Sequence, residues 1–304
     1  MISFSTKAET LERLSGVVKS ALVLPQVRFY ARAWPSEAAD ILQSLRAAGW
    51  LDRPLIVRSS AAAEDGAQGS LAGRFKSVPD VIGEAALQEA ITLVARSYGE
   101  ASIADQIFIQ PMLTDVACGG VAFSLDPNTG GPYFVINYDD TSGSTSSVTS
   151  GRSNQLKTFY GYRLAPRPPG GRLGEVAALL LELESLLESP ALDVEFAFTE
   201  DGRLHLLQVR PLAVSIPQSL GETHHRAVSE IHRKLQEAGR PHPYLHGERA
   251  LFGVMPDWNP AEIIGVRPRP LALSLYKEII TDNIWAYQRD NYGYSNLRSF
   301  PLML

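Results

Sequence analysis

With 304 residues the chain can form two domains or one large bilobed domain, and its 45% apolar and 20% charged content is ordinary for a soluble globular protein. The net charge of −5 argues against a nucleic-acid-binding surface, and the single cysteine, Cys118, excludes an internal disulfide framework and is expected to be a small buried residue. No apolar run is long enough for a membrane span and the N-terminus does not resemble a signal peptide, so we expect a cytoplasmic protein.

Hydrophobic periodicity predicts helices and short strands that intermingle along the chain. Helices are predicted at residues 7–17, 36–49, 84–98, 172–188, 221–239 and 272–292. Strands are predicted at residues 27–31, 55–58, 107–110, 121–124, 133–136, 194–199 and 204–209. Because hairpin turn signals separate several strands, the pattern favours an α+β fold with mixed or antiparallel sheets over a doubly wound parallel one. The glycine fingerprints of Rossmann and P-loop proteins are absent from the sequence.

Two stretches interrupt this pattern. Residues 141–154 are mostly glycine, serine and threonine and lie between strand patterns, so we expect a mobile loop inside a domain rather than a spacer. After Pro211 the sequence changes to a polar helix with three histidines, followed by an irregular stretch. We therefore place a domain boundary near residue 215.

The first of three segments with candidate functional residues follows the predicted strand at 55–58. That strand leads Arg58 into a loop of small side chains, residues 59–73. Backbone N–H groups in such a loop can approach phosphate oxygens closely, and a guanidinium adds fixed charge and paired donors. The segment predicts a phosphate-binding site, and the alternative is a surface loop held by a structural Arg–Glu pair.

The second segment joins Gln110-Pro111-Met112 to residues 119–130, in which two glycines precede an apolar strand that ends at Ser124. Glycines let a backbone lie against a flat ligand such as a purine. The alternative is a plain hairpin with a Pro-Asn-Thr-Gly turn.

The third segment is a predicted hairpin around the turn at residues 200–202. Asp193 and Glu195 share one face of its first strand, and Gln208 and Arg210 share one face of its second, because strand side chains alternate. Pairing of the strands would set two carboxylates against an amide and a guanidinium, which suits Mg²⁺ bound to a polyphosphate. The alternative is a solvent-exposed face with cross-strand ion pairs.

In this order the segments carry the patterns V-R-S-S-A-x-x-E-D, G-V-x-F-S-x-D-P-x-T-G, D-x-E-x-A and L-Q-x-R-P. Together they resemble the ATP-binding domain of the phosphoenolpyruvate synthase, pyruvate phosphate dikinase and rifampicin phosphotransferase family, over residues 5–213. The resemblance implies that residues 1–215 form a bilobed, ATP-grasp-like domain that binds ATP and Mg²⁺. In this family ATP phosphorylates a histidine on a separate swivelling domain, which passes the phosphoryl group to a small acceptor, and AMP is released.

The resemblance also implies roles for individual residues. Lys7 takes the place of the family's N-terminal lysine, which reaches the phosphates, although the glycines that usually precede it are missing. Arg58 matches the phosphate-contacting arginine and Arg210 the arginine of the closing motif, so these three cations are the predicted catalytic residues. Glu195 and Gln208 match the metal-side pair. The predicted nucleotide-binding residues are Lys7, Arg58, Gln110, Ser124, Asp193, Glu195, Gln208 and Arg210.

Two departures from the family pattern concern a loop and the histidines. Residues 139–151 keep only the closing Val-x-Ser-Gly of the family's Gly-Leu-Gly-Glu stretch. The adjacent His224 and His225 are expected to be solvated residues of a polar helix. A T-x-S-H setting, typical of the carrier histidine, is absent around each of His205, His224, His225, His232, His242 and His246. We therefore expect the swivelling phosphohistidine domain outside this chain.

Residues 247–304 are similar to phosphoenolpyruvate-synthase-like proteins of capsule and cell-surface polysaccharide pathways, one of which is an L-glutamine kinase. This similarity implies that residues 216–304 form a linker helix and the beginning of an acceptor-side domain. It makes the L-glutamine amide or pyruvate the expected acceptor. Because the chain stops on an apolar run at residues 299–304, we expect a fragment of a larger enzyme.

Two other functions stay open. An ATP-grasp ligase has similar lobes and forms an acyl-phosphate with release of ADP, but it lacks the combination of V-R-S-S-A and Q-x-R-P. A non-catalytic nucleotide-binding module is the other alternative. The intact charged residues argue against it, because a decayed site is expected to lose its charges first.

Overall fold

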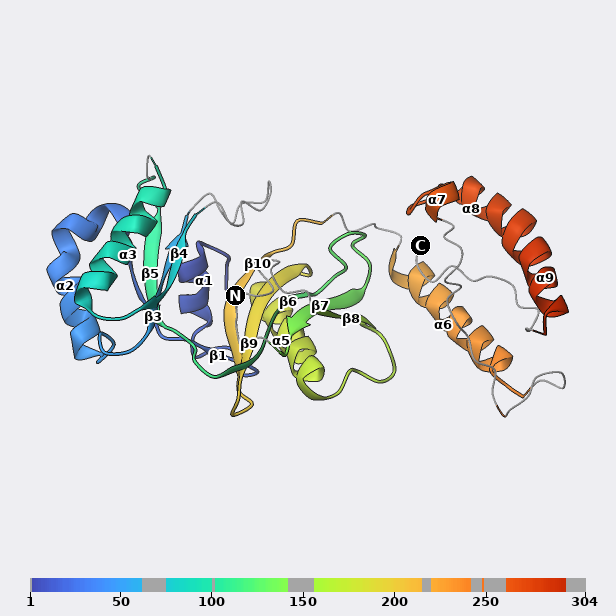
Figure 1. Ribbon diagram of the computed structural model, residues 1–304, viewed down its shortest axis with the longest axis horizontal. Helices are drawn as coiled ribbons and strands as arrows, with labels where there is room; N and C mark the ends of the chain where they lie inside the picture. The colour runs from blue at the N-terminus through green and yellow to red at the C-terminus, as the bar shows by residue number, and fades with distance from the viewer. Residues whose placement is uncertain are drawn as a thin grey trace. The chain divides into compact units, whose positions relative to one another are not determined.

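The computed structural model describes residues 2–61, 75–99, 102–141, 156–214, 220–241, 248 and 261–293. It divides into two compact units, Met1–Pro217 and Gln218–Leu304 (Figure 1). Several predictions lie outside the described residues. They are the small-residue loop beyond Ala61, the glycine- and hydroxyl-rich loop beyond Thr141, His242, His246, and the segments 249–260 and 294–304.

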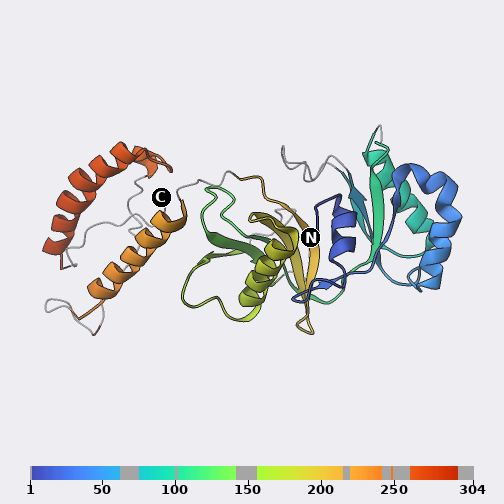
Figure 2. The same cartoon turned by 180° about the vertical axis from the view of Figure 1, so that it is seen from behind.

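The first unit contains a small antiparallel sheet with strand order β2-β5-β3-β4. Its strands are β2 (Val27–Tyr30), β5 (Gln106–Pro111), β3 (Leu55–Ser60) and β4 (Ser77–Val81). Two helices, α2 (Trp34–Ala47) and α3 (Glu84–Ser97), cover one face, and their leucines pack with Val57, Ile107 and Ile109 in one core. Figure 2 shows these helices on one side of the small sheet and α1 (Lys7–Leu14) on the other.

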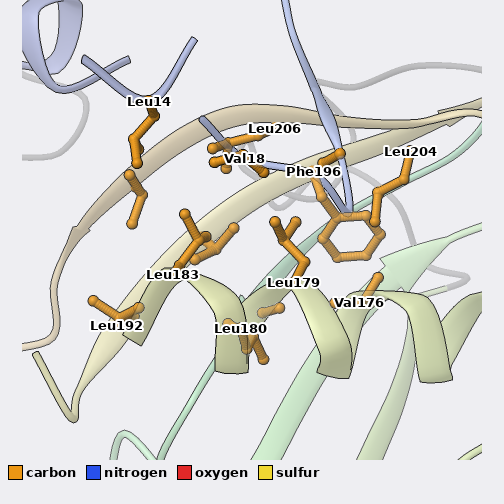
Figure 3. Close-up of a cluster of buried hydrophobic side chains, with 14 of the residues drawn as sticks. Leu14, Val18, Val176, Leu179, Leu180, Leu183, Leu192, Phe196, Leu204 and Leu206 are labelled. Atoms are coloured by element: carbon orange, nitrogen blue, oxygen red, sulfur yellow. The ribbon is translucent and has the colours of Figure 1, made fainter. Parts of the chain in front are cut away.

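The same unit contains a larger mixed sheet with strand order β1-β10-β9-β6-β7-β8. Its strands are β1 (Leu22–Val23), β10 (Leu204–Pro211), β9 (Leu192–Thr199), β6 (Val116–Phe123), β7 (Tyr133–Asp139) and β8 (Lys157–Tyr162). Among the described strands of this sheet, β1 and β10 pair in parallel and the other neighbours pair antiparallel. Helix α5 (Gly171–Leu187) covers one face, and Figure 3 shows its Leu179, Leu180 and Leu183 pointing toward the strands, with Leu14 and Val18 beside them.

The predicted α+β class with mixed and antiparallel sheets is confirmed, and the two sheets with separate cores are the two expected lobes. Three strands were not predicted: β1, β4 and β8. β4 contains a proline and Asp80 with a positive φ of 56°, and both β4 and β8 are edge strands. Edge strands tolerate such residues because half of their backbone groups need no partner strand.

The second unit is helical in its described part. It contains α6 (Leu220–Ala238), α7 (Ala261–Ile264), α8 (Pro270–Tyr276), the π-helical stretch Lys277–Trp285 and α9 (Ala286–Asn291). The predicted helix at 272–292 is therefore interrupted by π-helical backbone at its centre. The expectation that His224 is solvated was wrong, because it is 5% exposed and burial lowers its pKa, whereas His225 is exposed. Within the described ranges, no helix has the length and apolar character that a membrane crossing requires.

Gly120 shows why the larger sheet tolerates only a glycine at one position of β6. A Cβ there would lie 2.5 Å from the carbonyl oxygen of Asn137 and 2.7 Å from the Phe196 ring. Phe196 belongs to the core on the α5 side, so this glycine makes room for a core side chain.

We predict that Gly120→Ala lowers the free energy of unfolding by about 1–3 kcal/mol, because the added methyl group overpacks a site bounded by backbone. Denaturant unfolding followed by circular dichroism measures this loss. Gly170→Ala is the matched control, because a Cβ at Gly170 meets nothing within 4 Å. Equal stability of the two variants would contradict the packing argument.

Candidate active site

The face of the small sheet that turns away from α2 and α3 is polar. Alternation along β3 and β5 places Arg58, Ser60, Gln106 and Gln110 on this face, where Ser60 is the direct partner of Gln106 and Arg58 that of Phe108. Phe108 shares the face and belongs to the core of the larger lobe. The polar face of the small sheet therefore points toward the larger lobe.

Arg58 joins the two lobes through three contacts. Its Nη1 donates to the backbone carbonyl of Leu207 at 3.1 Å, and its Nη2 donates to Oε1 of Gln208 at 3.4 Å. The same Nη2 lies 3.5 Å from Oε2 of Glu195. The guanidinium carbon stands 5.4 Å from the centre of the Phe108 ring, a cation–π distance. The structure thus brings together three of the predicted site residues, from β3, β9 and β10.

A β-bulge in β10 makes this arrangement possible. Leu206 pairs with Phe196 in the core, and Gln208 pairs with Glu195 on the opposite face, because the register shifts between them. In a regular strand residues 206 and 208 would share a face. The extra residue, Leu207, supplies the carbonyl that accepts from Arg58. This carbonyl was not predicted, since no turn or glycine signal in the sequence marks the bulge.

Asp193 and Arg210 form the second half of the predicted hairpin face. They are direct cross-strand partners, next to the Glu195–Gln208 pair. Arg210 contacts Oδ2 of Asp193 through Nε at 2.8 Å and Nη2 at 2.6 Å. Burial raises the pKa of Asp193, and the charge of Arg210 opposes this effect. Asp193 thus fixes the plane of the Arg210 guanidinium through two contacts.

Lys7 is the first residue of α1, and its neighbours in sequence connect it to the small sheet. Thr6 caps the helix, and the backbone N–H of Ala8 donates to Oγ of Ser60 at 3.0 Å. Ser60 lies two residues beyond Arg58 on the same face of β3. The structure therefore places the backbone of Lys7 beside the strand that carries Arg58.

Gln110 and Ser124 have internal contacts in this structure. Gln110 is 3% exposed and its Nε2 donates to the carbonyl of Leu24 at 3.4 Å. Ser124 is fully buried, and its hydroxyl accepts from the N–H of Leu192 at 2.8 Å. Their assignment to nucleotide binding stays a prediction.

Glu195 and Gln208 together offer oxygen ligands of the kind that Mg²⁺ prefers. Among the described residues no cluster of three or more histidine, cysteine or acidic side chains could hold a metal by itself. A carboxylate and an amide oxygen that face each other across two strands do fit an ion that completes its shell with phosphate oxygens and water. In this structure the Arg58 guanidinium contacts both of these side chains, at the oxygens that a metal ion would use.

A cavity of about 320 Å³ lies on the α5 side of the larger sheet, opposite the face that carries Glu195. Its lining includes Cys118, Arg172, Phe196 and Phe198. Cys118 is buried, as predicted, and this burial raises the pKa of its thiol to about 11. The cavity is separate from the Arg58 contacts.

Residues 32–160 match the family described as pyruvate phosphate dikinase, AMP/ATP-binding domain. The predicted resemblance to this ATP-binding domain is confirmed. Residues 32–160 therefore belong to an ATP-binding domain of the pyruvate phosphate dikinase type, which supports nucleotide binding. The matched range contains Arg58, Gln110 and Ser124.

Several solved structures are similar to the chain at low sequence identity. VanG D-Ala:D-Ser ligase from Enterococcus faecalis is 15% identical with a TM-score of 0.39, over 70% of this chain and 53% of that one. N5-carboxyaminoimidazole synthetase from Staphylococcus aureus is 16% identical with a TM-score of 0.37, over 70% and 44%. An ATP-grasp ligase from Chryseobacterium gregarium is 13% identical with a TM-score of 0.34, over 63% and 47%. The chain thus spans about half the length of these structures, and a comparison with curated protein sequences found no match.

We predict that Arg58→Ala strengthens the binding of Mn²⁺, used in place of Mg²⁺, to the nucleotide-free protein by about fivefold, because one partly screened charge contact no longer competes for Glu195 and Gln208. The electron paramagnetic resonance signal of free Mn²⁺ measures this affinity. Arg203→Ala is the control, since Arg203 is exposed and pairs with Asp201 in a turn. Glu195→Gln added to Arg58→Ala should abolish the gain, and an unchanged affinity in Arg58→Ala would contradict the competition.

Proposed function

We propose that this chain is the ATP-binding, phosphoryl-donating part of a phosphoenolpyruvate-synthase-like phosphotransferase. The observation that supports the proposal is the cross-strand arrangement of Glu195, Gln208, Asp193 and Arg210, joined to Arg58 of the other lobe. This arrangement combines two fixed guanidinium groups with a carboxylate and an amide oxygen. Such a set matches the needs of a polyphosphate with its metal ion.

The proposed roles of the residues follow from their contacts. Phosphoryl transfer depends mostly on positioning and on neutralising charge on the phosphate oxygens. Three side chains would supply positive charge to the phosphates: Arg58 from β3 of the small sheet, Arg210 from β10 of the larger sheet, and Lys7 from the start of α1. Glu195 and Gln208 would hold Mg²⁺, which when bound neutralises phosphate charge. Asp193 would keep Arg210 oriented through its two contacts.

The proposed reaction passes the phosphoryl group to a histidine on a swivelling domain outside this chain and then to a small acceptor, and it leaves AMP. It stands beside two alternatives with different products. A ligase that forms an acyl-phosphate would leave ADP, and a non-catalytic module would bind ATP without turnover in the presence of a carrier domain. The proposed domain limits are 1–215 for ATP binding and 216–304 for a linker helix and the beginning of the acceptor side.

We predict that the chain binds ATP in a Mg²⁺-dependent manner, and that two variants affect binding differently. Arg210→Ala should weaken Mg-ATP by about tenfold or more, because a charge-assisted contact to phosphate is lost. Glu195→Gln should instead remove most of the difference between titrations with and without Mg²⁺. Isothermal titration calorimetry with a non-hydrolysable ATP analogue measures both effects.

Arg203→Ala serves again as the control for general loss of positive charge, since its side chain is 65% exposed. An unaltered chain that does not bind the analogue would contradict the proposed function. Parental affinity and parental metal dependence in both variants would contradict the assignment of these two residues.

A further prediction concerns the acceptor. In the complete enzyme with its carrier domain, Mg-ATP and L-glutamine should give a new phosphoramidate signal in phosphorus NMR, and AMP should accumulate. Pyruvate is the competing acceptor and would give phosphoenolpyruvate. Phosphoenolpyruvate from pyruvate with no product from glutamine would exclude the glutamine acceptor, and ADP as the nucleotide product would favour the ligase.

A further inference from the structure

The first turn of α1 is fastened to the small sheet on both sides of Lys7. On one side, Oγ1 of Thr6 donates to Oε1 of Gln106 at 2.8 Å. On the other side, the N–H of Ala8 donates to Oγ of Ser60 at 3.0 Å. Gln106 and Ser60 are themselves direct partners across β5 and β3. The backbone of Lys7 is therefore held between two bonds to the pair of strands that includes Arg58.

Gln106 uses both ends of its amide in this attachment. Its Nε2 donates to Oε1 of Glu9 at 2.7 Å, in the same helical turn. Hydrogen bonds from Ser5 and Gln106, with the charge of Arg28, lower the pKa of Glu9, so its carboxylate stays ionised at neutral pH. Gln106 is 2% exposed. A buried amide with both ends bonded resists rotation, because each lost bond would leave a polar atom unsatisfied.

The other side of the same helix is apolar. Leu11 and Leu14 belong to the core of the larger lobe, together with Leu183 and Leu206 of α5 and β10. Helix α1 is thus packed into one lobe and hydrogen-bonded to the other. Hydrophobic packing allows a helix to slide or rotate slightly, whereas the Gln106 bonds define one position along β5.

We propose that Gln106 is a positioning residue for Lys7. Its buried amide sets the first turn of α1 on β5, so that the Lys7 ammonium acts on the same phosphate group as Arg58. Gln106 acts only through the helix turn and contacts no nucleotide. This assignment rests on the proposed function of the chain and adds the residue that fixes the geometry of its N-terminal lysine.

A double-mutant cycle tests the assignment. The affinity for a Mg²⁺-bound, non-hydrolysable ATP analogue is measured by calorimetry for the unaltered chain, Lys7→Ala, Gln106→Leu and the double variant. Each single variant should lose about five- to twentyfold in affinity, as expected for a displaced or missing charge-assisted contact. The double variant should bind no more weakly than Lys7→Ala, because Gln106 has nothing left to position. A merely structural role would instead give additive losses.

A second test exchanges the side chains of Gln106 and Glu9, so that the double variant keeps a hydrogen bond between these two positions. Gln106→Glu alone sets two carboxylates against each other and should weaken nucleotide binding as Gln106→Leu does. Adding Glu9→Gln restores an amide–carboxylate pair with the roles exchanged, and affinity should return to within about twofold of the parent. This pair of variants decides the question if Gln106→Leu does not fold.

Glu182→Leu controls for simple loss of stability. Glu182 accepts from the backbone N–H groups of Lys19 and Ser20 at 2.8 and 2.9 Å, on the connection that follows α1, and has no bond to the first turn. Its variant should unfold more easily and keep parental affinity. Additive losses in the cycle, or parental affinity in Gln106→Leu, would overturn the assignment while leaving the proposed function intact. No binding by the unaltered chain would overturn both.

Discussion

The guanidinium of Arg58 is a charge enclosed between two lobes, and the candidate site depends on how that charge is compensated. Its side chain is 15% exposed, so water screens it only in part. A charge in such a place needs hydrogen bonds and an opposite charge nearby. A backbone carbonyl, an amide and a carboxylate of the larger lobe supply them, and an aromatic ring lies close to the guanidinium. The contact sets the lobe that holds β3 against the lobe that holds β9 and β10.

The partners of Arg58 face it because β10 departs from regular alternation. The strand buries Leu206 in the α5 core and then shows Gln208 on the opposite face, which a single extra residue makes possible. The same sheet therefore serves two purposes. One face is a leucine- and phenylalanine-rich core, and the other carries paired acidic, amide and basic side chains. Bulges beside functional sites commonly redirect side chains in this way.

Helix α1 connects the two lobes by two different kinds of interaction. Its leucines contribute to the core of the larger lobe, and its first turn is hydrogen-bonded to Gln106 and Ser60 of the small sheet. Apolar packing supplies most of the stabilisation, because it removes large side chains from water. Directional hydrogen bonds supply the precise position. A lysine at the start of such a helix is held by the geometry of both lobes, although it is remote in sequence from most of them.

The sequence by itself determined the parts of this protein that depend on local pattern. Periodicity predicted most of the helices and strands, and alternation correctly put Asp193 and Glu195 on one face of β9 and Gln208 and Arg210 on one face of β10. The ordered motifs indicated an ATP-binding domain of the pyruvate phosphate dikinase type, which the family match confirms. These features rest on residues close in sequence or on the composition of short segments.

Only the tertiary structure decided which distant residues meet. Phe108, Gln106 and the Leu207 carbonyl carry no motif, and their partners lie in other lobes or elements. The burial of His224 and the internal bonds of Ser124 also depend on neighbours that are far apart in the chain. The physical reason is that burial and hydrogen-bond partnership are set by the packing of whole elements, whereas a sequence pattern specifies only the face on which each side chain begins.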